Sequence, residues 1–207
     1  MLLVVPAYSA VSLYPPNSKE GYVARLLLNE VPFPGERGWI SEADTKAAMA
    51  SILWVLHARI EYVPRGYSQT ELATIKTNDI LDVITAGGIR GQCDGFYRDS
   101  DGNLKMVTRI PQRIDRLLKI ANTGSPERFA RLMEYGQRLT IAYFRGGMAA
   151  ADRFVSLERV GKVVVTGRAY SWMANQDFYH PGGDYIKIPD ADGGALGGNR
   201  FSTLRER

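Results

Sequence analysis

The chain has 207 residues, the size of one ordinary domain. Hydrophobic residues make up 45% and charged residues 23%, which excludes a disordered chain and indicates a packed core. The net charge of +4 comes without a dense basic block, so we expect no nucleic-acid partner. No apolar run is long enough for a membrane helix, so no membrane span is expected. Cys93 is the only cysteine, which excludes an intrachain disulfide.

Residues 1–16 are interpreted as an N-terminal arm or the remnant of a leader, and residues 17–207 as a single domain. The opening segment is apolar and carries small residues at Ala7 and Ala10, as the end of a secretory leader does. It has no basic region and is too short for a whole leader. An apolar first strand or a docked arm is the alternative.

The first half of the chain is predicted to be mainly helical. Asn17 and Glu20 have the spacing of a capping box and predict a helix over about 18–30. Ser41 predicts the start of a second, largely apolar helix over about 42–60. A third helix is expected over about 70–86, ending at Gly87-Gly88. Residues 89–110 are predicted to be irregular or a hairpin with its turn at 99–103.

The second half combines helices with a late β element. A short helix is expected over about 111–121. Ser125 and Pro126 predict the start of a long helix that reaches about 145 and ends at Gly146-Gly147. Residues 163–166 are the best strand candidate, and residues 170–173 are expected to pair with it. The fold class is therefore α+β, mostly helical, with a small antiparallel β element in the C-terminal third.

Glu30 is the strongest candidate for chemistry. Tyr22, Val23, Leu26 and Leu27 form an apolar helix face, and Glu30 continues that face. The helix must end near Pro32. Partial burial and the negative end of the helix dipole should both raise the pKa of Glu30, as a general acid near neutral pH requires. The alternative is a helix-end glutamate that points into solvent.

The order of several motifs resembles the cell wall hydrolases of the spore-cortex-lytic type, a branch of the lysozyme-like and lytic transglycosylase superfamily. These motifs are Glu30 at the end of a helix, the apolar helix 47–56, the segment 79–84 leading to Gly91-Gln92, the segment 177–181, and the closing segment 197–201. The resemblance implies a lysozyme-like domain that cleaves peptidoglycan glycan strands as a lytic transglycosylase or muramidase. It also implies a bacteriolytic protein of the periplasm or cell wall, or a secreted one. No cofactor and no metal ligands are predicted from the sequence. If the protein is a toxin, an inhibitory immunity protein is a further expected partner.

By position, the resemblance makes Glu30 the catalytic acid/base and Gln92, Tyr179, His180 and Asn199 groove residues. Two departures concern the specificity of the groove: Val31-Pro32-Phe33-Pro34-Gly35-Glu36 follows Glu30, and His57-Ala58-Arg59 ends the second helix. Aromatic side chains late in the chain could stack on sugar rings, with neighbouring amides binding N-acetyl and hydroxyl groups, or could be ordinary core. The further substrate-binding candidates from this cluster are Tyr170, Trp172 and Asn175; Phe178, Tyr185, Gln176 and Asp177 accompany them.

Glycosidic cleavage usually needs two carboxylates. Glu36, Asp94 and Asp184 are the candidates for the second one, and the sequence does not choose among them. A lytic transglycosylase needs only Glu30, because the 6-hydroxyl of the sugar attacks and leaves a 1,6-anhydro end. That single-carboxylate pattern fits the sequence best.

Two other classes of function stay open. In the first, Cys93 is the nucleophile and His180 the base of a cysteine peptidase or amidase that acts on stem peptides. However, a turn rather than a helix is predicted to follow Cys93. In the second, the chain is a non-catalytic wall-binding module. Asp99, Asp101 and Asn103 have the spacing of calcium ligands, but an Asx turn explains them better because no glutamate follows at the twelfth position.

Overall fold

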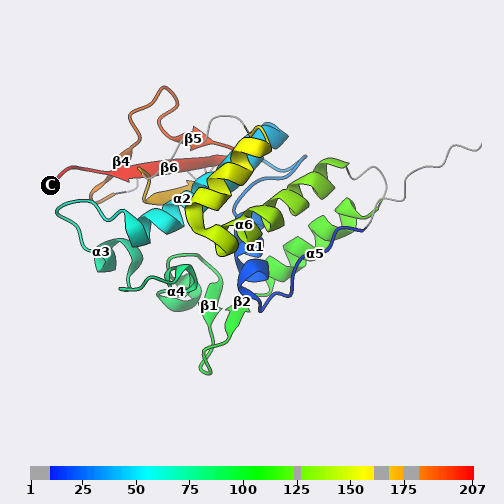
Figure 1. Ribbon diagram of the computed structural model, residues 1–207, viewed down its shortest axis with the longest axis horizontal. Helices are drawn as coiled ribbons and strands as arrows, with labels where there is room; N and C mark the ends of the chain where they lie inside the picture. Colours follow the sequence, from blue (N-terminus) through cyan, green and yellow to red (C-terminus); the bar gives the residue numbers. More distant parts are fainter. Residues whose placement is uncertain (1–9, 124–126, 161–167, 175–181) are drawn as a thin grey trace, which may run out of the picture.

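The computed structural model describes residues 10–123, 127–160, 168–174 and 182–207. It shows a mixed fold in which a helical body carries a small antiparallel sheet on one side and a short hairpin on another (Figure 1). The sheet is built from the C-terminal part of the chain, as expected. None of the helices in the described part of the chain is long and apolar enough to cross a membrane.

The first two helices carry most of the apolar core. Helix α1 (Lys19–Asn29) begins at Ser18, whose Oγ accepts a hydrogen bond from the Gly21 N–H at 3.1 Å. The predicted cap at Asn17 is therefore wrong by one residue. Helix α2 (Glu42–Glu61) begins at Ser41, as predicted, and is buried on most of its surface. Its only exposed residues are Ala43 and Glu61, close to its two ends, so its middle runs through the core of the domain.

The prediction of a single helix over 70–86 is wrong. The chain forms two short helices instead, α3 (Gln69–Ala73) and α4 (Ile80–Thr85). Thr74 adopts a left-handed conformation with φ 64°, which stops α3. The Asp79 side chain then accepts a hydrogen bond from the Leu81 N–H at 2.9 Å and starts α4. The prediction that the helical stretch ends at Gly87-Gly88 is confirmed in part. Helix α4 has its C-cap at Ala86, and Gly87, directly after it, has the left-handed conformation.

A short hairpin follows the 3-10 helix η1 (Gly88–Arg90). Strands β1 (Phe96–Arg98) and β2 (Leu104–Met106) pair antiparallel, as one of the two predicted alternatives. The turn between them is an Asx turn: Asp99 Oδ1 accepts from the N–H groups of Asp101 and Asn103 at 3.0 and 2.9 Å.

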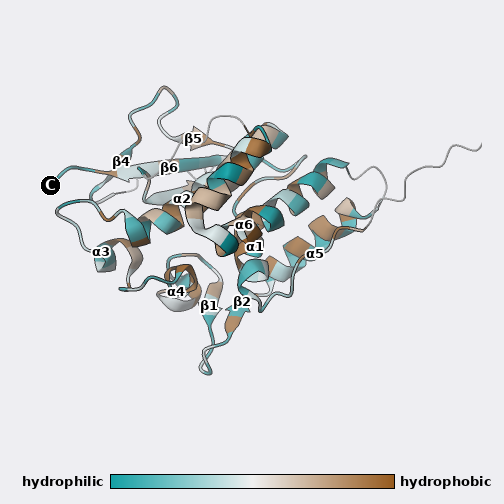
Figure 2. Cartoon of the chain, viewed as in Figure 1, coloured by the Kyte–Doolittle hydropathy of each residue, from teal (hydrophilic) through white to brown (hydrophobic). Residues whose placement is uncertain are grey.

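Two further helices complete the body. Helix α5 (Arg109–Ala121) is amphipathic: it buries Ile110, Ile114, Leu117 and Ala121. Figure 2 shows hydrophobic and hydrophilic residues alternating along it. Helix α6 (Glu127–Leu157) packs against α1, α2 and α5. The prediction that this helix ends at Gly146-Gly147 is incomplete: these two residues have non-helical angles, and a second helical segment continues to Leu157. Ser125 and Pro126 lie outside the described residues.

The sheet contains β3 (Ser171–Ala174), β4 (Tyr185–Lys187), β5 (Ala195–Leu196) and β6 (Asn199–Leu204). The strand order is β3-β6-β4, with β5 also paired to β6, and all pairings are antiparallel. Residues 171–173 thus form a strand as predicted, but they pair with β6. The predicted strand 163–166 lies outside the described residues. Trp172 lies opposite Phe201, so β6 determines where the Trp172 side chain stands.

Candidate functional site

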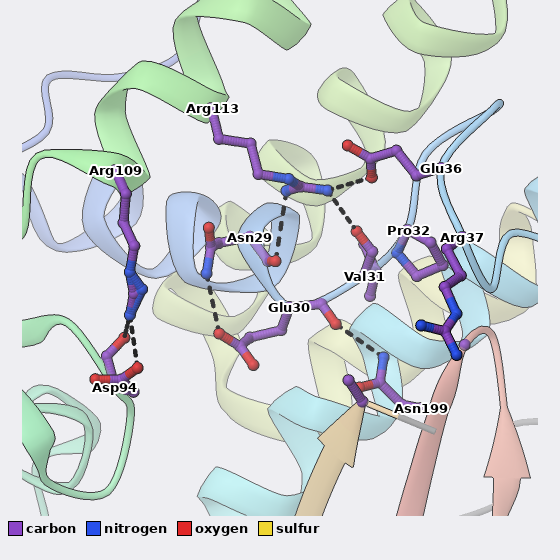
Figure 3. Close-up of a pocket in the computed structure, with 12 residues that line it drawn as sticks. Asn29, Glu30, Val31, Pro32, Glu36, Arg37, Asp94, Arg109, Arg113 and Asn199 are labelled. Atoms are coloured by element: carbon purple, nitrogen blue, oxygen red, sulfur yellow. Dashed lines mark hydrogen bonds and ion pairs between the residues drawn. The ribbon is translucent and has the colours of Figure 1, made fainter. Parts of the chain in front are cut away.

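Glu30 lies where α1 ends, as the sequence predicted. It forms the C-cap with a helical backbone conformation, and its N–H donates to the Leu26 carbonyl at 3.0 Å. Pro32 cannot continue the helix, so the chain turns away directly afterwards. The side chain is partly exposed and faces a cavity of about 570 Å³ (Figure 3). The walls of this cavity come from the end of α1 and the loop that follows it, the turn before β1, the start of α5, and the strands β3 and β6.

Three side chains hold Glu30 in place. Trp172 Nε1 donates to Oε2 at 3.1 Å, and Asn29 Nδ2 donates to Oε1 at 3.1 Å. The buried Asn199 Nδ2 donates to the Glu30 carbonyl oxygen at 2.8 Å, which satisfies one acceptor at the helix end. Trp172 and Asn199 are both predicted site residues, and the structure brings them to Glu30 from β3 and β6.

Burial raises the pKa of Glu30, because removing the charged carboxylate from water costs free energy. The hydrogen bonds from Trp172 and Asn29 oppose this shift, as do the more distant charges of Arg113 and Arg109, since all four favour the ionised form. The net direction is upward. A carboxyl group with a raised pKa that still reaches a cavity can carry a proton to a bound molecule.

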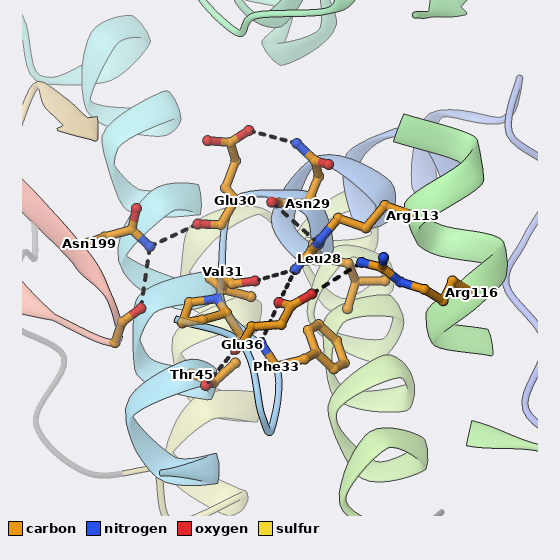
Figure 4. A network of polar contacts seen from close by, with 12 residues as sticks. Leu28, Asn29, Glu30, Val31, Phe33, Glu36, Thr45, Arg113, Arg116 and Asn199 are labelled. Atoms are coloured by element: carbon orange, nitrogen blue, oxygen red, sulfur yellow. Dashed lines mark hydrogen bonds and ion pairs between the residues drawn. The ribbon is translucent and has the colours of Figure 1, made fainter. Parts of the chain in front are cut away.

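The end of α1 is fastened by Arg113, as Figure 4 shows. One of its nitrogens, Nη1, donates to the Leu28 carbonyl at 2.7 Å and the Asn29 carbonyl at 3.4 Å. The other, Nη2, donates to the Val31 carbonyl at 3.0 Å and to Glu36 at 2.5 Å. The guanidinium thus replaces the helical partners that these last carbonyls lack.

Arg113 and its neighbours on α5 were missed as site residues. Arg109 and Arg113 line the cavity, and Arg116 contacts Glu36. A signal for them exists in the sequence: the spacing of four and then three residues puts all three arginines on one helix face. Asn29, also missed, could have been suspected from its position beside Glu30.

The three candidates for a second carboxylate differ in their position and in their partners. Glu36 lines the cavity, but its oxygens are engaged by Arg113, by Arg116 at 3.5 Å, and by the Phe33 N–H at 2.9 Å. Asp94 lines the same cavity, is well exposed, and forms an ion pair with Arg109 at 2.6 Å. Asp184 does not line this cavity and pairs with Arg207.

Gln92 and Tyr170 do not line the Glu30 cavity; both contact Arg59 instead. Gln92 accepts from Arg59 Nη1 and donates to Thr74 Oγ1, both at 2.6 Å. The Tyr170 carbonyl accepts from Arg59 Nε at 2.9 Å. The Arg59 guanidinium lies over the Trp172 ring, 5.5 Å from its centroid. Gln92 and the Tyr170 carbonyl therefore hold Arg59, and Arg59 in turn packs against the Trp172 ring.

Several predicted residues fall outside the described part of the chain. They are Asn175, Tyr179 and His180, together with their neighbours Gln176, Asp177 and Phe178. Tyr185 is described and lies in β4, packed against the small apolar cluster that contains Tyr170.

Cys93 is buried, with 3% of its surface exposed, and lies in a turn rather than at a helix start. Burial raises the pKa of its thiol well above the ordinary value, although the nearby Arg59 opposes this. A neutral, covered thiol is a poor nucleophile.

Within residues 10–123, 127–160, 168–174 and 182–207, no group of three or more His, Cys, Asp or Glu side chains could hold a metal ion. Asp190 accepts hydrogen bonds from the N–H groups of Asp192 and Gly194, so the Asp-rich segment 190–194 forms an Asx turn as well.

Comparison with known proteins gives no family: no protein-family model matches the chain, and neither a curated protein nor a solved structure does.

Proposed function

We propose that this protein cleaves the glycan strands of peptidoglycan, as a lysozyme-like lytic transglycosylase that uses Glu30 as its general acid and base. The observation that carries the proposal is a glutamate whose pKa is raised by burial, held by Trp172 and Asn29 at the wall of a cavity. The ordered motifs that resemble the spore-cortex-lytic hydrolases place the catalytic glutamate at this same position.

In the proposed reaction, protonated Glu30 gives its proton to the oxygen of the glycosidic bond as that bond breaks. The resulting carboxylate then removes the proton from the 6-hydroxyl of the same sugar, which attacks the anomeric carbon. The product is a 1,6-anhydro ring, and Glu30 ends protonated, ready for the next cycle. The hydrogen bonds from Trp172 and Asn29 stabilise the carboxylate formed halfway, so the proton can be released as well as held.

The single-carboxylate route is favoured over a two-carboxylate hydrolase by the state of the other acids. Glu36 is occupied in holding the end of α1 through Arg113. Asp94 is exposed and neutralised by Arg109. These two ion pairs also offset part of the positive charge of Arg113 and Arg109, which would otherwise disfavour a cationic sugar centre in the cavity more strongly.

The test is mass spectrometry of fragments released from purified peptidoglycan. Wild type should release anhydro-muropeptides, and Glu30→Gln should lower the rate by at least about 100-fold, the range for loss of a general acid. Glutamine keeps an acceptor for Trp172, so the fold should be retained. Cys93→Ala serves as the control and should keep the activity.

Other products would redirect the proposal. Reducing-end sugars, lost on Asp94→Asn, would indicate a hydrolase with Asp94 as the second carboxylate. Cleaved stem peptides that depend on Cys93 would refute the proposal in favour of a peptidase. No fragments from any variant would leave a binding module as the function.

A further inference from the structure

A second cavity, of about 850 Å³, lies at the other end of the sheet from Glu30. Strand β6 connects the two: Asn199 lines the Glu30 cavity, and Leu204 lines the second one. Leu204 follows Asn199 by five positions along the strand, which corresponds to about 17 Å. The remaining walls come from the loop after α2, the residues before β3, and strand β4. This space is therefore distinct from the proposed catalytic site.

Positive charge dominates the second cavity. Its lining includes five basic side chains and a single acidic one, Glu206; the basic ones are Arg65, Arg168, Lys187, Arg205 and Arg207. Arg207 is paired with Glu71 and Asp184. Arg65, Arg168 and Arg205 are exposed, and none of these three forms an ion pair with another residue in the described parts of the chain. Their charge is available to a ligand.

The same cavity has an apolar wall. Tyr170 and Ile188 are each only 6% exposed, and Ile186, Leu204 and two prolines stand beside them. An ordinary hydrated ion gains nothing from such a wall. A ligand with both anionic and apolar groups would bury its apolar part here and keep its anionic groups at the rim.

The walls are held in place without a ligand. The Tyr67 hydroxyl donates to the Arg205 carbonyl at 2.8 Å, and Arg207 donates to the Gly66 carbonyl at 3.1 Å. The Arg207 guanidinium also lies over the Tyr67 ring, 3.9 Å from its centroid. Figure 1 shows the C-terminal end beyond β6 beside the loop that leads to α3. Because the two segments are already joined, a ligand need not order them, which favours binding.

We propose that this cavity binds a short acidic peptide whose carboxylates alternate with apolar side chains. The three available arginines come from three separate segments, so they suit several anionic groups spaced along a chain better than one compact anion. A phosphate is typically held by main-chain N–H groups at a helix start, and the described lining residues include no helix start. Arginine forks bind carboxylates in two-point contacts. The proposal goes beyond glycan cleavage and does not depend on Glu30.

The test is calorimetric titration at low salt with a capped hexapeptide of alternating glutamate and leucine. Wild type should bind it, and the Arg65→Ala/Arg205→Ala variant should bind it about tenfold more weakly, since each partly exposed ion pair contributes about a threefold change. Arg128→Ala/Arg153→Ala removes two exposed arginines from α6 instead and should change the affinity less than twofold. Glu30→Gln should bind as wild type does, so a failure here is separate from a failure of the proposed catalysis.

Four results would overturn the proposal. The first is no binding of the acidic peptide to wild type. The second is equal affinity for a matched peptide with glutamine in place of glutamate. The third is equal weakening by the two double variants, which would reflect overall charge alone. The fourth is tighter binding of inorganic tripolyphosphate than of the peptide, which would make the cavity a phosphate site.

Discussion

Replacing Arg113 with alanine should destabilise the protein by about 3 kcal/mol, because Arg113 holds the end of α1. Arg113 donates its two shortest main-chain hydrogen bonds to the carbonyls of Leu28 and Val31. Because the donor is charged, each of them contributes about 1.5 kcal/mol to the free energy of unfolding. The ion pair with Glu36 adds about 1 kcal/mol, since both side chains are largely covered, at 19% and 28% exposure. Folding of wild type also fixes the rotamers of the long Arg113 side chain, and alanine avoids this entropy cost. The loss of stability is therefore reduced by about 1 kcal/mol.

The measurement is urea unfolding at pH 7 with linear extrapolation to water. Arg116→Ala is the matched control: Arg116 lies on the same helix and contacts Glu36 at 3.5 Å, but it is 64% exposed, so its loss should cost less than about 0.5 kcal/mol. A loss below about 1 kcal/mol for Arg113→Ala, or one equal to that of Arg116→Ala, would refute the idea that Arg113 secures the helix end. The proposed activity on peptidoglycan should also fall with Arg113→Ala, because the backbone of Glu30 lies within the segment that Arg113 holds.

Three further predictions concern the site itself. In urea unfolding, the stability of Glu30→Gln relative to wild type should increase from pH 4 to pH 8. The reason is that burial raises the pKa of Glu30 in the folded state. The contribution of protonated Glu30 to folding stability is therefore complete below the unfolded-state pKa and is lost as the pH rises through the folded-state pKa. No growth with pH would contradict this. Trp172→Phe removes a hydrogen bond to the charged carboxylate, so the pKa of Glu30 should rise further. The alkaline limb of the profile of the proposed activity against pH should then move to higher pH. A limb that stays in place or moves to lower pH would contradict this role of the Trp172 hydrogen bond. Cys93 should be inert to a thiol reagent in the native protein and react fully in denaturant, because it is buried; rapid native labelling would show that it is accessible.

Local patterns in the sequence were enough to find Glu30, but not its partners. The apolar face of α1 and Pro32 are neighbours of Glu30 along the chain, so periodicity alone located the acid at a half-buried helix end. Trp172 and Asn199 were named from an aromatic cluster and a motif. That they meet Glu30 is a contact across 142 and 169 residues, which depends on sheet pairing that no local rule supplies.

The errors in the helix predictions have local physical causes. Periodicity over 70–86 suggested one helix, but Gln69 bonds to both the N–H and the carbonyl of Thr77 and closes a loop between α3 and α4. Thr74 takes the left-handed conformation that the loop needs, which a rule based on glycine and proline does not detect. At Gly146-Gly147 the opposite happened: the helix break was visible in sequence, but the helical segment after it was not.

Gln92 and Tyr170 were expected to touch a substrate, and their actual positions explain how the C-terminal sheet supports the acid. Arg59 is buried, so its charge must be surrounded by polar partners, and Gln92 and the Tyr170 carbonyl supply them. With Arg59 fixed against the face of the Trp172 ring, the indole N–H is directed at Glu30. The site is therefore assembled from two parts of the chain. Helix α1 supplies the Glu30 carboxylate and one donor to it, Asn29, and β3 supplies the second donor, Trp172. Strand β6 holds the backbone of Glu30 through Asn199 and pairs with β3. Burial raises the pKa of Glu30 and the two donors lower it, so the proton affinity of Glu30 depends on both parts of the chain.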